Sequence, residues 1–151
     1  MIEEAIKLEM NISKLYMLFY RLFSDDSDFW WELAIEEQNH AALLKTARQM
    51  NKSDVTIPKE MLPAGVEELV DSNHRIMQAL DEFEISPERN RAFQVALTFE
   101  TGAGELHYNT FMKNQDHSVV SSVFKKLNSD DIDHAQRIRK YMTDNQIPDP
   151  D

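Results

Sequence analysis

Six ionisable side chains interrupt apolar stripes that otherwise keep helical spacing along the chain. Each stands where the next apolar residue of an amphipathic helix is expected, so each belongs to a predicted core face. Carboxylates buried together without compensation would take up protons, because desolvation and mutual repulsion both disfavour their charged form. Two divalent cations would offset four negative charges, and imidazoles would add neutral nitrogen ligands. The candidate metal ligands are Glu9, Glu37, His40, Glu100, Asp131 and His134.

The two histidine-containing segments share one spacing. Glu37 precedes His40 by three residues, which places both on one face of a helix. Asp131 precedes His134 by the same interval. An offset of 94 residues carries the first segment onto the second, and an offset of 91 carries the first candidate glutamate onto Glu100. This internal repeat predicts two similar helical units around one dinuclear site.

Long helices must position these residues, because helix-breaking residues are scarce. The chain has three glycines and five prolines, and no proline falls within 1–57 or 88–147. The apolar period of about 3.6 residues predicts helices over 2–23, from Ser27 to about 51–54, over 66–83, from Pro87 to the turn at 115–117, and over 120–142. Ser86 is the expected N-cap before Pro87, and the tail 147–151 is expected to fray.

The connections between these helices predict the fold. Short turns at 24–27 and 115–117 make two antiparallel hairpins, and the stretch marked by Pro58 and Pro63 joins them through a crossover with its own helix. We therefore expect an all-α fold, a four-helix bundle with an extra helix, as a single domain over 1–151. At about 1.5 Å of rise per residue, the six candidate ligands lie within one or two helical turns of each other in height.

At these positions the chain resembles the ferritin-like superfamily of di-iron carboxylate proteins, and more loosely its rubrerythrin and bacterioferritin branches. The family pattern is a Glu on each of two helices and Glu-x-x-His on each of the other two. Glu9 and Glu100 match the single positions, and Glu37-Gln38-Asn39-His40 matches the first motif. Asp131-Ile132-Asp133-His134 matches the second with a shorter acid. The resemblance implies a ferritin-like bundle with two Fe ions, or Mn or Zn, at these six residues.

The resemblance also implies an oxidoreductase that reduces O2 or hydrogen peroxide, with an electron donor that remains to be identified. Rubrerythrins typically carry a further Glu three residues after the position of Glu100, which is Ala103 here, and the chain has no cysteine for a rubredoxin-like donor. Metal binding or storage without turnover, and a metal-free helical interaction module, are the alternatives. Because the Pro- and Asp-rich end stands where ferritin cages carry a further helix, we expect a monomer or homodimer rather than a cage.

Composition excludes several other classes of function. Sixteen Lys and Arg against 27 Asp and Glu give a net charge of −11, which repels nucleic acid and anionic membranes. No run approaches the roughly 20 apolar residues of a membrane span. The absence of cysteine excludes disulfides, thiolate nucleophiles and iron–sulfur clusters. The acidic start lacks the features of a signal peptide, so a cytoplasmic protein is expected.

Residues beside the candidate ligands leave alternatives open. Glu105 competes with Glu100 for the place on its helix, although it lies away from the main stripe. Glu36 and Asp130 stand one turn before the two histidines, where they are either surface acids or acceptors for the second ring N–H of a metal-bound imidazole.

Four further residues have a simple interpretation and a chemical one. Tyr16 and His107 lie two turns from the carboxylates, as core residues or as groups acting near the metals. Gly102 and Gly104 each cost about 1 kcal/mol relative to Ala inside a helix, so they indicate close helix packing, a π-bulge or room for a small ligand. His74 also follows an acid by three residues but has no partner at matching height, so a solvated face is expected.

Overall fold

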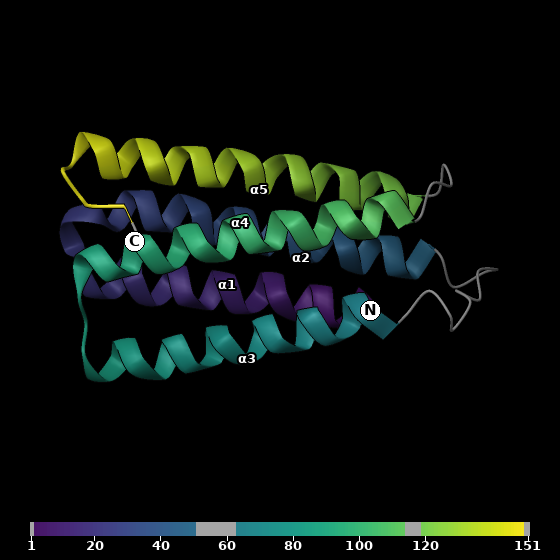
Figure 1. Ribbon diagram of the computed structural model, residues 1–151, viewed down its shortest axis with the longest axis horizontal. Helices are drawn as coiled ribbons and strands as arrows, with labels where there is room; N and C mark the ends of the chain where they lie inside the picture. Colours follow the sequence, from purple (N-terminus) through teal and green to yellow (C-terminus); the bar gives the residue numbers. More distant parts are fainter. Residues whose placement is uncertain (1, 51–62, 114–118, 150–151) are drawn as a thin grey trace.

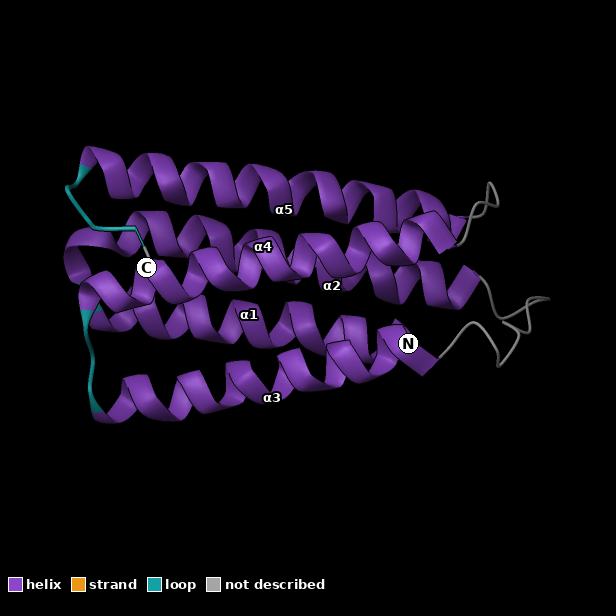
Figure 2. Cartoon of the chain, in the orientation of Figure 1, coloured by secondary structure: helices purple, strands orange, loops and turns teal. Residues whose placement is uncertain are grey.

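The structure, a computed structural model, describes residues 2–50, 63–113 and 119–149, with side chains except at 63–65 and 104–113. Within these ranges the chain forms five α-helices, one 3-10 turn and no strand (Figures 1 and 2). The elements are α1 (Ile2–Leu22), η1 (Ser24–Asp26), α2 (Ser27–Met50), α3 (Pro63–Ile85), α4 (Arg89–Lys113) and α5 (Val119–Asp144). The expectation of an all-α chain is confirmed over the described residues. The turn expected at 115–117 and the linker residue Pro58 lie outside them.

The helices pack as two hairpins and a flanking helix. α1 packs against α2, and α4 packs against α5. Contacts between α2 and α5 join the two pairs, while α3 packs against α1 and α4. Figure 1 shows α3 and α5 at opposite edges of the bundle, with the α1–α2 turn, the α3–α4 connection and the end of the described chain at one end. Candidate ligands on α1, α2, α4 and α5 can therefore meet inside the bundle.

The fourth helix starts later than Ser86 and Pro87 led us to expect. α4 begins at Arg89, and Ser86 instead continues the end of α3 through its amide, which donates to Glu82 O at 2.8 Å. The carboxylate of Glu88 caps α4, accepting hydrogen bonds from the amides of Asn90 at 3.0 Å and Arg91 at 2.7 Å. This cap satisfies two amides that the helix itself leaves without acceptors, which sets its first residue.

The end of α5 does not fray at once. Gln146 adopts the left-handed conformation with φ of 58°, and the amide of Ile147 donates to Met142 O at 2.9 Å. This geometry is a helix C-cap of the Schellman type, in which the chain reverses and a following apolar residue returns to the core. Ile147 is accordingly buried, so the expectation of a frayed tail from this residue is wrong.

Apolar burial between the helices holds the bundle together. The largest fully buried side chains include Trp30, Tyr16, Phe19, Phe93 and Phe124. Some large apolar side chains lie outside the core, among them the exposed Trp31 and Met77. His74 is exposed, as expected. None of the helices in the described part of the chain is long and apolar enough to cross a bilayer.

Candidate metal centre

All six candidate ligands are buried, with exposed fractions between 1% and 4%. α1 contributes Glu9, α2 contributes Glu37 and His40, α4 contributes Glu100, and α5 contributes Asp131 and His134. The helices bury these groups because each occupies the apolar stripe that forms the interface with its neighbours. Burial of charged residues at such a level requires compensation by partners or by a metal.

Five of the six residues form two groups that share one carboxylate. Glu9, Glu37 and His40 form the first group, and Glu37, Glu100 and His134 form the second. Within each group one potential ligand atom per residue lies within 4.8 Å of the others. Glu37 Oε2 lies 3.2 Å from His40 Nδ1, while its Oε1 lies 2.8 Å from His134 Nδ1. The two oxygens of Glu37 therefore face different histidines, as in a carboxylate that bridges two metal ions.

Each imidazole turns one nitrogen inward and the other outward. His40 Nδ1 also lies 3.4 Å from Glu9 Oε2, and His134 Nδ1 lies 3.4 Å from Glu100 Oε2. The two rings stack at a centroid distance of 5.4 Å and an interplanar angle of 21°. The Nδ1 atoms are therefore the candidate metal donors, and the Nε2 atoms are left for hydrogen bonding.

The outward nitrogens pair with carboxylates of the opposite hairpin. His40 Nε2 on α2 lies 3.1 Å from Asp130 Oδ2 on α5, and His134 Nε2 on α5 lies 2.7 Å from Glu36 Oε2 on α2. Glu36 and Asp130 are thus acceptors for the ring N–H groups, and each serves the histidine of the other helix. A carboxylate in this place fixes the imidazole tautomer and orientation with Nδ1 free to bind metal.

Cations support both outer carboxylates. Arg137 Nη1 donates to Glu36 Oε2 at 2.7 Å, and Lys126 Nζ donates to Asp130 Oδ2 at 2.6 Å. Partial burial opposes ionisation of Glu36, but the hydrogen bonds from Arg137 and His134 outweigh it and lower the pKa of this carboxyl. Glu36 is therefore an ionised acceptor at neutral pH.

Burial and crowding shift the pKa values of the inner groups upward. Burial, together with the charges of Glu100 and Glu9, raises the pKa of Glu37 to about 8. Burial opposes the charged imidazolium of His40, yet the hydrogen bonds and charges of Glu37 and Glu9 outweigh it and raise the pKa of His40 to about 11. Glu100 and Glu37 in the same way raise the pKa of His134 to about 12 against the effect of burial. Without metal, protons thus supply the positive charge that the buried carboxylates require.

The hydrogen bonding of the inner donor atoms also suits a bound metal ion. Among the described residues, Glu37 Oε1, Glu100 Oε2 and His134 Nδ1 are buried and have no well-directed hydrogen-bond partner. All three belong to the second group, where Glu37 Oε1 and His134 Nδ1 face each other at 2.8 Å, so one ion bound among them would give all three atoms a directed partner. The donors are carboxylate oxygen and imidazole nitrogen, which suit iron, manganese and zinc.

Comparisons with protein-family models, with curated proteins and with solved structures each found no match to the chain.

Asp131 departs from the symmetry of the sequence repeat. It is the counterpart of Glu37 at an offset of 94 residues and is 2% exposed, but neither three-residue group includes it. Its side chain is one methylene shorter than that of Glu37, which limits its reach from α5. Glu100 does belong to a group, whereas the side chains of Glu105 and His107 lie outside the described residues.

Tyr16 contacts the candidate centre directly, although its sequence spacing placed it two turns away. Its hydroxyl donates a hydrogen bond to Glu100 Oε1 in the fully buried interior. Burial and the negative charges of Glu100 and Glu37 raise its pKa well above the ordinary value, so Tyr16 remains a donor. In the sequence, Tyr16 was notable only as an aromatic residue with a hydroxyl on the same apolar stripe as Glu9. Its hydrogen-bond partner, Glu100, lies on the other hairpin, which spacing within one helix does not indicate.

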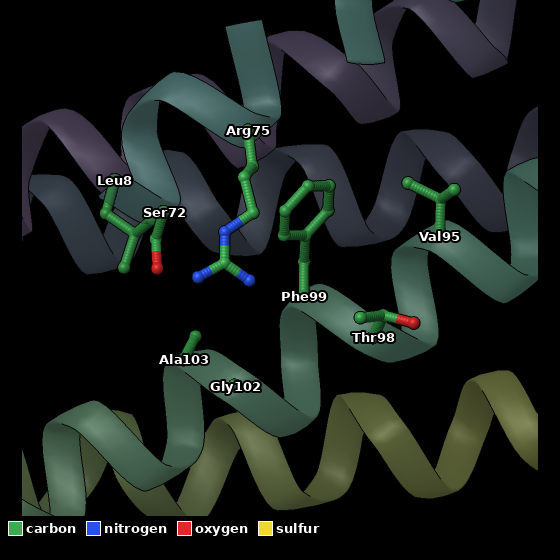
Figure 3. Close-up of a pocket in the computed structure, with 8 residues that line it drawn as sticks. All are labelled: Leu8, Ser72, Arg75, Val95, Thr98, Phe99, Gly102 and Ala103. Atoms are coloured by element: carbon green, nitrogen blue, oxygen red, sulfur yellow. The ribbon is translucent and has the colours of Figure 1, made fainter. Parts of the chain in front are cut away.

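The space beside Gly102 is separate from the candidate ligands. A cavity of about 180 Å³ lies between α1, α3 and α4, and none of the six candidate ligands lines it (Figure 3). Figure 3 shows the guanidinium of Arg75 pointing into this cavity, opposite Gly102 and Ala103. A Cβ at Gly102 would meet nothing within 4 Å, and α4 is a continuous α-helix there, so the suspected π-bulge is not observed at this residue. The surroundings of Gly104 lie outside the described side chains.

A polar cleft gives the candidate centre an outer wall. The cleft has a volume of about 310 Å³ and lies between α2 and α5. Both histidines line it, together with Glu36, Asp130 and Asp133. The outer carboxylates that hold the imidazoles are therefore in contact with solvent.

Substitution of the outer carboxylate Glu36 should weaken metal binding. Glu36→Gln removes the negative charge that accepts the His134 Nε2–H, and loss of such a partner typically lowers metal affinity by about 10–100-fold. The dissociation constant for Mn(II), measured by competition with a chelator, tests this expectation. Glu32→Gln is the matched control, because Glu32 lies on the same helix and 3.5 Å from Arg137 but is largely exposed. Equal affinities for the two variants would contradict the role of Glu36.

Proposed function

We propose that the chain is a dinuclear metal carboxylate protein of the ferritin-like kind, which reduces O2 or hydrogen peroxide. The observation that carries this proposal is the pair of buried three-residue groups that share Glu37, each with one histidine. The arrangement of four helices with single carboxylates on α1 and α4 and acid–His pairs on α2 and α5 agrees with the ferritin-like pattern. This pattern of carboxylates and histidines is the feature of the bundle that supports a ferritin-like assignment.

The chain's own residues would hold two ions in different surroundings. Glu9 and His40 would bind one ion, Glu100 and His134 the other, and Glu37 would bridge them. Two iron ions in such a site supply reversible electron transfer to O2 or peroxide, and manganese offers related chemistry. The carboxylates offset the added positive charge when the ions are oxidised, and the outer acids keep both imidazoles oriented.

The surrounding core limits access to the centre. Leu33, Leu44, Leu127 and Ile138 are fully buried on the two helices that carry the histidines. These apolar neighbours keep bulk water from the inner carboxylates, which strengthens their interaction with a bound cation. The polar cleft between α2 and α5 leaves the outer edges of the histidines accessible to exchange with solvent.

Anaerobic loading followed by oxidant tests the proposed function. Purified protein titrated with Fe(II) should bind about two ions per chain, one for each three-residue group. Addition of hydrogen peroxide should then produce the near-ultraviolet absorption of a carboxylate-bound diferric centre, with consumption of the peroxide over repeated cycles when a reductant is present. Iron binding without peroxide consumption would replace the enzyme proposal by metal binding or storage. Failure to bind Fe(II), Mn(II) and Zn(II) would leave only a metal-free helical module.

A further inference from the structure

A continuous chain of aromatic rings leads from the candidate metal centre to one end of the bundle. Tyr16, hydrogen-bonded to Glu100, contacts Trp30 with ring centroids 5.5 Å apart. Trp30 contacts Phe93 at 4.5 Å, and Phe93 stacks on Tyr141 at 5.2 Å with an interplanar angle of 8°. A parallel connection runs through Phe29, which lies 5.3 Å from Trp30 and 4.3 Å from Tyr141.

Both ends of this chain have an acceptor for a phenol proton. The Tyr16 hydroxyl donates to Glu100, and the Tyr141 hydroxyl donates to Asp26 Oδ1 at 2.8 Å. Oxidation of tyrosine by one electron is easiest when a base accepts the proton in the same step. Asp26 is buried and is itself held by two hydrogen bonds from Arg89, at 2.7 and 2.8 Å. The outer tyrosine is half-buried, and its hydroxyl reaches the 3-10 turn η1 between α1 and α2.

Trp30 in the middle has a different environment. It is fully buried, and its Nε1 has no hydrogen-bond partner among the described residues. A buried indole N–H usually finds a partner, so this group departs from the ordinary pattern. Since no described residue accepts the Nε1 proton, we expect an oxidised Trp30 to keep it and to be a transient cation rather than a stable neutral radical. That property suits a relay between two tyrosines.

We propose that Tyr16, Trp30 and Tyr141 form a one-electron transfer path between the candidate metal centre and the surface beside Asp26. This inference rests on the proposed function for its oxidant, the oxidised metal centre. The electron donor at the surface would be an external one-electron reductant. Such a donor is needed because the chain has no cysteine and so no cysteine-bound redox group of its own.

The electrons and protons balance along the path. Tyr16 gives one electron to the oxidised centre while its O–H bond breaks and the proton moves to Glu100 Oε1. Trp30 then gives one electron to Tyr16, and the proton returns from Glu100. Tyr141 gives one electron to Trp30 while its proton moves to Asp26 Oδ1, and the external reductant restores Tyr141 with return of that proton. The net result is transfer of one electron from the reductant to the centre without net proton movement.

A photochemical experiment on metal-free protein tests the path independently of metal binding. Because the chain has no cysteine, Asp28→Cys gives a single attachment point for a ruthenium polypyridyl photo-oxidant at the exposed start of α2. After a laser flash with an electron acceptor in solution, we expect a Trp radical cation absorption that precedes a tyrosyl signal. Part of the tyrosyl electron paramagnetic resonance signal should belong to Tyr16 and should be lost in Tyr16→Phe.

The variants separate an electron relay from aromatic packing. Trp30→Phe keeps an aromatic ring in the core but should remove the same part of the tyrosyl signal as Tyr16→Phe, and the double variant should remove no more. Trp31→Phe is the matched control, because Trp31 is 46% exposed and its ring contacts Tyr20 outside the path. Retention of the Tyr16 signal in folded Trp30→Phe would overturn the proposal.

The parent protein supplies a second measurement that needs no core substitution. A Tyr16 radical that forms without a preceding Trp radical, or no Tyr16 radical at all, would also overturn the path. Since no metal is present, these outcomes leave the proposed dinuclear centre untouched.

Discussion

Glu37→Ala is expected to abolish high-affinity binding of both metal ions. Glu37 is the only residue shared by the two groups of candidate ligands described, so its loss removes a donor from each. A ligand at 100 times its dissociation constant stabilises a folded protein by about 2.7 kcal/mol per site. For a chain of this size each kcal/mol raises the melting temperature by about 2–4 °C. The variant should therefore lose the whole rise in melting temperature that Mn(II) gives the parent, measured by differential scanning calorimetry.

Substitutions of two other acidic residues test whether the loss of metal binding is specific to Glu37. Glu32→Ala should keep the full metal response, because Glu32 is on the same helix but is 65% exposed at the side chain. Asp131→Asn should retain binding at one or both groups, because neither includes Asp131. A loss of both ions in Asp131→Asn with retention in Glu37→Ala would show that the roles of these two acids are reversed.

The metal-free protein should lose stability as the pH rises through the neutral range. Folding raises the pKa of Glu37 from 4.5 to about 8, so its stabilising contribution is complete below 4.5 and is lost as the pH approaches 8. Folding raises the pKa values of His40 and His134 from 6.5 to about 11 and about 12, so their contribution declines above 6.5. All three groups bind protons more tightly in the folded state, and the three effects therefore have the same sign. Chemical denaturation at pH 5, 7 and 9 with a chelator present measures the decline.

Metal should restore the stability that protons no longer supply. Binding requires deprotonated donors, so the gain in melting temperature from Mn(II) should be larger at pH 8 than at pH 5. Glu37→Leu gives an independent check, because it replaces a costly buried carboxyl by an apolar side chain of similar size. At alkaline pH the metal-free parent holds Glu37 ionised beside Glu100 and Glu9. The substitution removes that repulsion and the cost of burying the charge, so this variant should exceed the metal-free parent in stability there while losing metal binding. A melting temperature independent of both metal and pH would contradict this electrostatic account.

Local patterns in the sequence predicted most of the helical architecture. Helical periodicity identified the elements because burial of one stripe is a property of each helix alone. The boundaries at Ser86 and Ile147 were wrong, since they depend on the Glu88 cap and on a reversal that returns Ile147 to the core. These errors are local, and they leave the positions of the candidate ligands on their helices unchanged.

The candidate centre shows where prediction from the sequence ended. The sequence by itself predicted six ionisable residues on core stripes from their helical spacing, with Glu105 left as a rival to Glu100. Only the tertiary structure decided that Glu37 joins both groups, that Asp131 joins neither, and that Glu36 supports the histidine of the opposite hairpin. The contact of Tyr16 with Glu100 was likewise decided there. These relations depend on the rotation and relative height of packed helices to about the length of a bond, which side-chain packing across the bundle sets and which no spacing within one helix contains.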